Sequence, residues 1–435
     1  MRLITPAAKE VRHKMGANKV TTFLRKYMML IATVIVVIVF YFITGGKTLY
    51  PINIDSLISQ NAYVFVLGTG MLLCILTGGN IDLSVGSVVC LAGGVGAIMM
   101  AKIPWDNVAW PLAVIAMLAM GLLVGLWHGF WIAYVKVPPF IATLVGMLAF
   151  RGLANIIMGG YAYDIDNKTF LNVFGGGDSC YVPDFLAKVG PELVIAGNKL
   201  NKTCFIIAVL IAVGFAVFTF INRTRLIKQG YKVDSLVGVI VKTILIVAVV
   251  IWFGYKLACY RGLPTGFIWI ALVLGIFAYI TSKTTLGRNL YAVGGNEKAT
   301  RLSGIDTRKV MFSAYTLMGL LSGFAGILNI ARLQGSTPTY GVGYEMDAIA
   351  ACFIGGASAY GGTGSIGGVI IGAALMGIIN QGMSIADTPI NYQKVVKGIV
   401  LIVAVLFDVI MQMRRKGSKK KATSVEAAEK GGAKA

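Results

Sequence analysis

Two carboxylates within apolar sequence are the side chains most able to do chemistry. Asp82 lies in a glycine-rich interruption, and Asp347 lies within an apolar run. A carboxylate at membrane depth is costly and can serve as a proton or sodium site, so both residues are candidates for ion coupling. We prefer a structural interpretation. Asp82 would cap a helix beginning at Leu83, accepting from the N–H groups around Ser84 and Val85, and Asp347 would lie near water at a helix end.

Patterns for catalysis and metal binding are missing from the sequence. The two histidines, His13 and His128, are too few for a histidine metal cluster, and the six cysteines form no CxxC or CxH pair. No GxxxxGK(S/T) sequence occurs, so the chain cannot supply its own ATPase. A bridge among Cys180, Cys204 and Cys259 could form if their loops are external. We therefore expect no catalysis, no metal and no cofactor.

The composition indicates a membrane protein. Of the 435 residues, 57% are hydrophobic and only 13% are charged, whereas a soluble domain carries about 25% charged residues. The 39 basic residues outnumber the 18 acidic ones, but they lie mostly between the apolar runs. This placement favours membrane topology over nucleic-acid binding, so we expect the lipid bilayer and not nucleic acid as a partner.

The apolar runs predict an all-α polytopic membrane protein with about twelve transmembrane helices. Basic residues in 223–232, 283–309 and 414–434 place these segments and both termini in the cytoplasm. The permease domain would occupy 27–411, between a basic N-terminus at 1–26 and a disordered basic tail at 412–435. The expected spans are 27–44, 61–77, 83–101, 110–135, 139–158, 203–221, 236–256, 266–281, 310–331, 346–360, 364–384 and 395–411.

Two apolar stretches, 76–86 and 354–368, are interrupted by glycine. Paired interruptions in the two halves of a membrane chain point to a transport pathway, because broken helices are tolerated only where protein or a water-filled cavity satisfies the backbone. They could equally be tight turns of helical hairpins near the inner surface, and the two interpretations are compatible. The candidate pathway residues are Gly78, Gly79, Asp82, Ser84, Gly86, Asp347, Gly355 and Gly356.

Glycines spaced by four residues predict close packing between helices. They occur at Gly121, Gly125 and Gly129, at Gly319 and Gly323, and at Gly364, Gly368 and Gly372.

The loop 282–309 carries two short helices by its capping signals. The first would run from Leu286 to Val293 and end at Gly294-Gly295. Asn296 would cap the second, which would run to Ser303 and stop at Gly304. A capped helix on the inner surface is either a contact for a cytosolic partner or a helix lying on lipid headgroups.

This loop and two other blocks resemble the permease subunits of bacterial ATP-binding-cassette sugar importers of the ribose, xylose and galactose branch. Residues 286–305 are similar to the segment through which those permeases contact their ATPase. Residues 77–87 resemble the family's TGGIDLSVGS block, with Asn80 as an insertion, and 341–351 resemble its GxGYELDAIAA block. The segment 223–281 adds about two spans that shorter members lack, as in xylose and multiple-monosaccharide permeases.

The resemblance implies a multi-pass permease of the bacterial cell membrane, commonly a homodimer. A cytosolic ATPase subunit would dock on it, and an extracytoplasmic binding protein would deliver a sugar. The alternative is an ion-coupled secondary transporter that works alone, and a branched-chain amino-acid permease is the nearest family of similar pattern. By this resemblance the ATPase contacts are Gly295, Asn296, Glu297, Lys298, Ala299, Thr300, Arg301, Leu302, Ser303 and Gly304.

Overall fold

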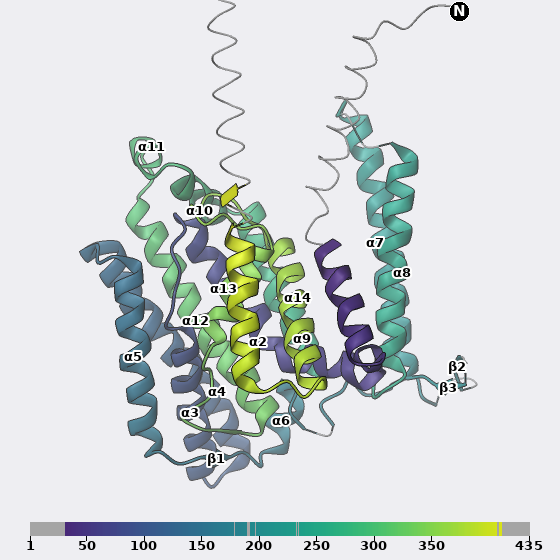
Figure 1. Cartoon of the computed structure of the whole chain (residues 1–435), viewed down its shortest axis with the longest axis horizontal. Coiled ribbons are helices and arrows are strands. Elements are labelled where there is room, and N and C mark those ends of the chain that lie inside the picture. The colour runs from purple at the N-terminus through teal and green to yellow at the C-terminus, as the bar shows by residue number, and fades with distance from the viewer. Residues whose placement is uncertain are drawn as a thin grey trace, which may run out of the picture.

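The computed structural model describes residues 31–177, 179–188, 192–195, 197–231, 233, 235–406 and 409–410. Helices make up most of these residues (Figure 1). They are the helix Ile31–Ile43, η1 (Lys47–Leu49), α2 (Pro51–Leu76), α3 (Val85–Lys102), α4 (Asp106–Gly129), η2 (Phe130–Val135), α5 (Pro139–Met158), α6 (Lys168–Phe174), α7 (Lys202–Lys228), α8 (Leu236–Ala258), α9 (Thr265–Lys283), α10 (Thr285–Gly295), α11 (Glu297–Leu302), α12 (Thr307–Leu333), α13 (Tyr344–Ile354), α14 (Ile366–Ile385) and a last helix over 390–406.

Four short strands accompany the helices. The pair β1 (Tyr163–Asp164) and β4 (Gly335–Ser336) is antiparallel, with Tyr163 opposite Ser336. The pair β2 (Val194–Ile195) and β3 (Asn198–Lys199) forms a hairpin before α7. The β1–β4 pair lies at one end of the bundle and α11 lies at the other, and we call these the β1 end and the α11 end (Figure 1).

Within the described residues, nine helical segments are long and apolar enough to cross a membrane. This confirms the all-α polytopic fold, but three of the twelve expected spans, 27–44, 346–360 and 395–411, are not among these nine. The span expected at 395–411 falls on the last helix and includes residues outside the described part of the chain. The span expected at 346–360 is instead the 11-residue helix α13, about 16 Å long and too short to cross about 30 Å of hydrocarbon. The span expected at 27–44 begins outside the described residues, as do the segments 1–26 and 412–435.

The centre of the bundle is formed by α2 and α12. Of the most apolar 18-residue window of α2, 89% is buried inside the protein. Helix α12 packs on α4 through glycines: a Cβ atom on Gly121 would lie 2.4 Å from the carbonyl oxygen of Gly319, and one on Gly323 would lie 2.6 Å from that of Met117. The expectation that glycines spaced by four bring helix backbones together is therefore confirmed here.

Candidate functional site

The first glycine interruption turns the chain back along α2. Positive φ angles at Gly78 (134°) and Gly79 (78°) produce the turn, and the N–H of Asp82 then donates to Sδ of Met71, one turn up α2. Oδ1 of Asp82 accepts from N (2.8 Å) and Oγ (2.6 Å) of Ser84. The expected bond from the N–H of Ser84 is present, but α3 begins at Val85 and not at Leu83, and its N-cap is Ser84 with no side-chain cap bond. Asp82 therefore holds the turn that precedes the helix.

The second interruption, 355–365, joins α13 to α14. Gly356 has a φ of 84°, and Gly355 lies so close to α14 that a Cβ on it would be 2.4 Å from the carbonyl oxygen of Gly368. The two interruptions touch, because a Cβ on Gly79 would be 2.0 Å from the carbonyl oxygen of Ala359. At this contact the N–H of Gly362 donates to the carbonyl of Leu76 at 3.1 Å.

Helix α10, within the loop 282–309, meets both interruptions. A Cβ on Gly294 would lie 1.8 Å from the carbonyl oxygen of Leu76 and 2.4 Å from N of Gly362. The hydroxyl of Tyr291 donates to the carbonyl of Gly364 at 2.8 Å. The helix ends at the glycine pair as expected, although α10 includes both glycines and Asn296 is its C-cap. Glycine stands at 294 because the helix touches backbone there.

A third unwound stretch follows α12 and was missed by sequence reasoning. Helix α12 ends at Leu333, and the chain then passes through β4 and residues 337–343 before α13 starts. The α13 carboxylate of Asp347 accepts from the hydroxyl of Tyr63, which lies at the middle of α2. Helix α13 therefore starts halfway across the bundle. Pro338, Gly341 and Gly343 belong to a largely polar stretch, 332–345, that the expected spans leave out, but nothing in the sequence shows that this stretch lies halfway across the bundle.

The starts of α3 and α13 meet at this depth. A Cβ on Gly86 would lie 2.1 Å from the carbonyl oxygen of Gly341, and one on Gly341 would lie 2.2 Å from that of Gly86. The same arrangement therefore occurs twice: a long helix, an unwound stretch, and a second helix that begins at mid-depth. The first copy is α2 followed by α3, and the second, which runs in the opposite direction, is α12 followed by α13. Transporter pathways are commonly built where two such inverted repeats meet.

Asp347 is fully buried, so the expectation that it lies near water is wrong. Its Oδ2 accepts from Nζ of Lys397 at 2.9 Å, from the Tyr63 hydroxyl at 2.6 Å and from Nδ2 of Asn380 at 3.3 Å. The ring of Tyr63 stacks on that of Tyr344 with centroids 3.6 Å apart. Lys397, on the last helix, was not singled out in the sequence, and it neutralises the carboxylate.

The candidate ATPase contacts form an exposed projection at the α11 end. Oδ1 of Asn296 accepts from N of Ala299 at 3.0 Å, which confirms the cap, and Gly304 has a φ of 84°. Nine of the ten residues from 295 to 304 are exposed, and Thr300 is buried. The side chain of Leu302 is 90% exposed. This apolar side chain therefore faces away from the rest of the chain.

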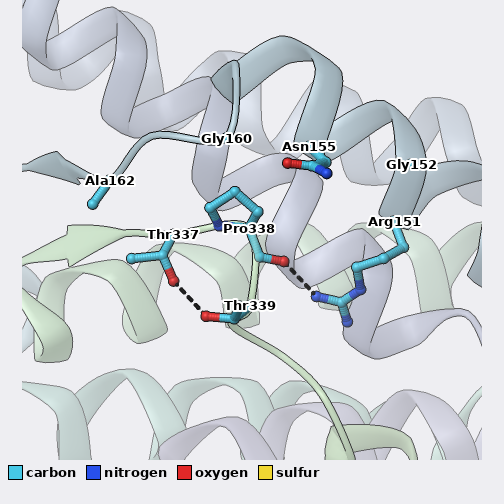
Figure 2. A pocket seen from close by; sticks show the side chains of 8 residues that line it. All are labelled: Arg151, Gly152, Asn155, Gly160, Ala162, Thr337, Pro338 and Thr339. Carbon is cyan, nitrogen blue, oxygen red and sulfur yellow. Dashed lines mark hydrogen bonds between the residues drawn. The ribbon is translucent and has the colours of Figure 1, made fainter.

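A cavity of about 490 Å³ opens towards the β1 end beside α5, and we call it the α5–β4 cavity (Figure 2). Nη1 of Arg151 donates to the carbonyls of Pro338 and Tyr340, and the hydroxyls of Thr337 and Thr339 are 2.8 Å apart. The cavity is lined by Arg151, Gly152, Asn155, Gly160, Ala162, Thr337, Pro338 and Thr339.

The cysteines of the large loop and its neighbours are not paired. Cys180, Cys204 and Cys259 are all free thiols, so no bridge joins them. Within the described residues, no cluster of three or more His, Cys, Asp or Glu side chains could hold a metal ion.

Comparison with known proteins places the chain among transport permeases. The family model described as "Branched-chain amino acid transport system / permease component" matches residues 53–219 and 193–405. The chain is 36% identical over 385 residues to the xylose transport system permease protein XylH of Escherichia coli K12, covering 88% of this chain and 92% of that protein. It is 33% identical over 357 residues to the ribose import permease protein RbsC of the same strain, covering 82% and 85%. No solved structure matches.

Proposed function

The chain belongs to the family of branched-chain amino acid transport system permease components, and we propose that it carries a monosaccharide as the permease subunit of an ATP-binding-cassette importer. It is a multi-pass membrane protein related over most of its length to xylose and ribose permeases. The observation that carries the proposal is the exposed helix α11, held on α10 against the two glycine interruptions.

The α11 end faces the cytoplasm in this proposal. Arg223 and Arg225 near the end of α7, and the basic residues of 283–309, lie at that end, as the excess of positive charge in cytoplasmic loops predicts. The exposed Leu302 offers an apolar anchor, and Lys298 and Arg301 surround it with charge. Such a site suits a cytosolic ATPase subunit, because isolated apolar anchors with a polar rim dominate the binding energy of many interfaces.

A push on α11 has a direct mechanical route to the centre. Helix α11 follows α10 after the single residue Asn296. Gly294 of α10 contacts Leu76, the last residue of α2, and Gly362 of the second interruption. Because these contacts are between backbones, displacement of α10 must move the ends of both broken segments. The hinges of this movement would be the candidate residues Gly78, Gly79, Gly355 and Gly356.

The substrate we propose is a sugar of the xylose type. The family description names amino acids, but the curated relatives at 36% and 33% identity are named for xylose and ribose. An extracytoplasmic binding protein would deliver the sugar at the β1 end, and two copies of the chain would form the complete path. ATP hydrolysis would belong to the partner subunit, because the sequence has no GxxxxGK(S/T) motif.

The ion-coupled alternative is weakened by the partners of the two carboxylates. Oδ1 of Asp82 is bonded to Ser84 at the start of α3. Asp347 forms an ion pair with Lys397. Neither carboxylate is placed as an open site for a transported proton or sodium ion, whereas both are suited to hold broken helices in position.

Co-purification from detergent-solubilised membranes tests the docking site. We expect an ATPase subunit to copurify with the native chain and to be lost with Leu302→Asp. The matched control is Tyr231→Asp, at the same end but on the α7–α8 hairpin, where the side chain is 63% exposed. Glu297 is a poor test position, because its Oε1 accepts from Thr307 and its loss would disturb the helix itself.

Uptake tests the substrate. Proteoliposomes with the chain, its ATPase and the binding protein should accumulate xylose when ATP is supplied, and unlabelled leucine should not compete. Uptake driven by a proton or sodium gradient without the ATPase would overturn the proposal.

A further inference from the structure

We propose that the α5–β4 cavity is the vestibule in which the sugar is held by hydrogen bonds after it leaves the binding protein. This inference rests on the proposed function. It assigns a ligand, a neutral polyhydroxylated molecule, to a set of residues on α5 and on the unwound stretch after β4.

The cavity reaches well into the membrane. Arg151 precedes Met158, the last residue of α5, by about two turns, which places it about 10 Å below the end of that helix. An arginine at this depth is costly when it faces lipid and is found where it faces protein or water. Its guanidinium lies over the stretch 338–340 in Figure 2, so the wall of the cavity is polar at membrane depth.

The wall opposite α5 is non-helical backbone. Residues 337–343 lie between β4 and α13, and within them the carbonyls of Pro338 and Tyr340 accept from side chains and not from a helix. On one side Sγ of Cys90 contacts the carbonyls of Thr337 and Pro338. On the other side the carbonyls accept from Arg151 beside the cavity. Unwound backbone at membrane depth is tolerated where it is buried in protein or lines a water-filled cavity, and this stretch does both.

The free polar groups match a sugar. In the described part of the chain, the Asn155 side-chain amide has no hydrogen-bond partner, and Figure 2 shows it on α5 across the cavity from the Thr337 and Thr339 hydroxyls. Amides and hydroxyls both donate and accept, as sugar hydroxyls do. A lipid chain in the cavity would leave Asn155 without any partner, which is costly.

The volume and the lining indicate transient binding. About 490 Å³ falls within the range of roughly 300–1,000 Å³ typical of small-molecule sites. The eight lining residues include no aromatic ring on which a sugar could stack. Weak binding suits a vestibule, because a tightly held sugar would not move on. The lining residues 337–339 are followed along the chain by Gly341, where the starts of α3 and α13 meet.

Transport by the complete importer tests this assignment. We expect Asn155→Leu to lower xylose uptake at least tenfold, without changing ATPase copurification or sugar binding by the isolated binding protein. Asn155→Gln should retain most of the uptake. The control is Ile156→Ala, the next residue on α5, whose side chain is 78% exposed. Native uptake by Asn155→Leu would overturn the inference, whereas failure of the native chain to import sugar would overturn the proposed function itself.

Thiol labelling tests whether the cavity holds water. Cys259 is the one cysteine of the described chain that is not buried, so Asn155→Cys is made together with Cys259→Ala. A charged, membrane-impermeant methanethiosulfonate should label Asn155→Cys from the β1 side and block uptake, and binding protein loaded with xylose should slow the labelling. Absence of labelling would show that lipid or protein fills the cavity and would overturn the inference.

Discussion

The centre of the bundle and the α7–α8 hairpin are both apolar, yet they are built differently. In α2, 89% of the most apolar 18-residue window is buried, against 17% in α7 and 6% in α8. The centre combines broken helices, backbone contacts at glycines and a buried ion pair. The hairpin consists of two uninterrupted helices beside the rest of the bundle (Figure 1). Apolar sequence is needed for both, but only the centre requires particular residues at particular positions.

The largest expected effect that would test this contrast is at Gly294. Gly294→Ala places a Cβ 1.8 Å from the carbonyl oxygen of Leu76, so α10 must move away from both interruptions. We expect the free energy of unfolding to fall by several kcal/mol, as in severe overpacking of a core, and little of the protein to fold. Thermal unfolding in detergent measures the change. Gly295→Ala is the matched control, because a Cβ there would meet nothing within 4 Å. Equal stability of the two variants would contradict the backbone contact.

The next effect concerns the buried ion pair. Lys397→Met leaves the Asp347 carboxylate buried without its cation, at a cost of about 3–5 kcal/mol. The double variant Asp347→Asn/Lys397→Met should recover most of that loss, because no unpaired charge remains. Lys394→Met, an exposed lysine one turn earlier on the same helix, should be neutral. A double variant as unstable as Lys397→Met alone would show that the charge is not the cause.

A matched pair of leucines compares the two regions by packing alone. Leu72 on α2 is fully buried, and Leu245 on α8 is 62% exposed. Lipid is as apolar as leucine, so only packing and cavity terms remain in a membrane. We expect Leu72→Ala to cost about 1–3 kcal/mol and Leu245→Ala less than about 0.5 kcal/mol. Chemical unfolding in mixed micelles measures both. Comparable losses would mean that the hairpin is packed as tightly as the centre.

The smallest effect is a pH dependence at the start of α7. Burial opposes ionisation of Asp184, but hydrogen bonds from the Thr203 hydroxyl and from the N–H groups of Lys202, Thr203 and Leu186 outweigh it and hold the pKa of Asp184 below its usual value. A lowered pKa contributes stability above the unfolded pKa, and this is lost as the pH falls through the folded value.

Hydrogen exchange of the first turn of α7 measures this effect. We expect it to accelerate on going from about pH 5 to about pH 3, while the centre of α2 stays protected. Asp184→Asn should exchange at the same rate at both values after correction for intrinsic exchange. Acceleration in α2 together with α7 would mean that the two regions do not open separately.

Patterns along the chain predicted the all-α membrane fold, the hydrogen bond that Asp82 accepts from Ser84, the Asn296 cap and the family. Each of these is set within a few neighbouring residues: an apolar run must lie in lipid, and an Asx side chain reaches N–H groups two or three positions ahead. The same local logic placed the end of α10 at Gly294-Gly295, where the helix does end, but it missed why residue 294 must be glycine. The reason for glycine there is a carbonyl more than 200 positions earlier in the chain.

What only the tertiary structure decided is how distant segments meet. Nothing near Asp347 in the sequence indicates Lys397 as its partner, because the pairing depends on the last helix packing against α13. The stretch 337–343 was left outside the expected spans, but its depth in the bundle was hidden. The half-length of α13 was hidden too, because an apolar run reads alike whether it crosses the bundle or starts halfway. Composition and capping are local properties of the chain, whereas depth in the membrane and the pairing of buried charges are set by packing between helices.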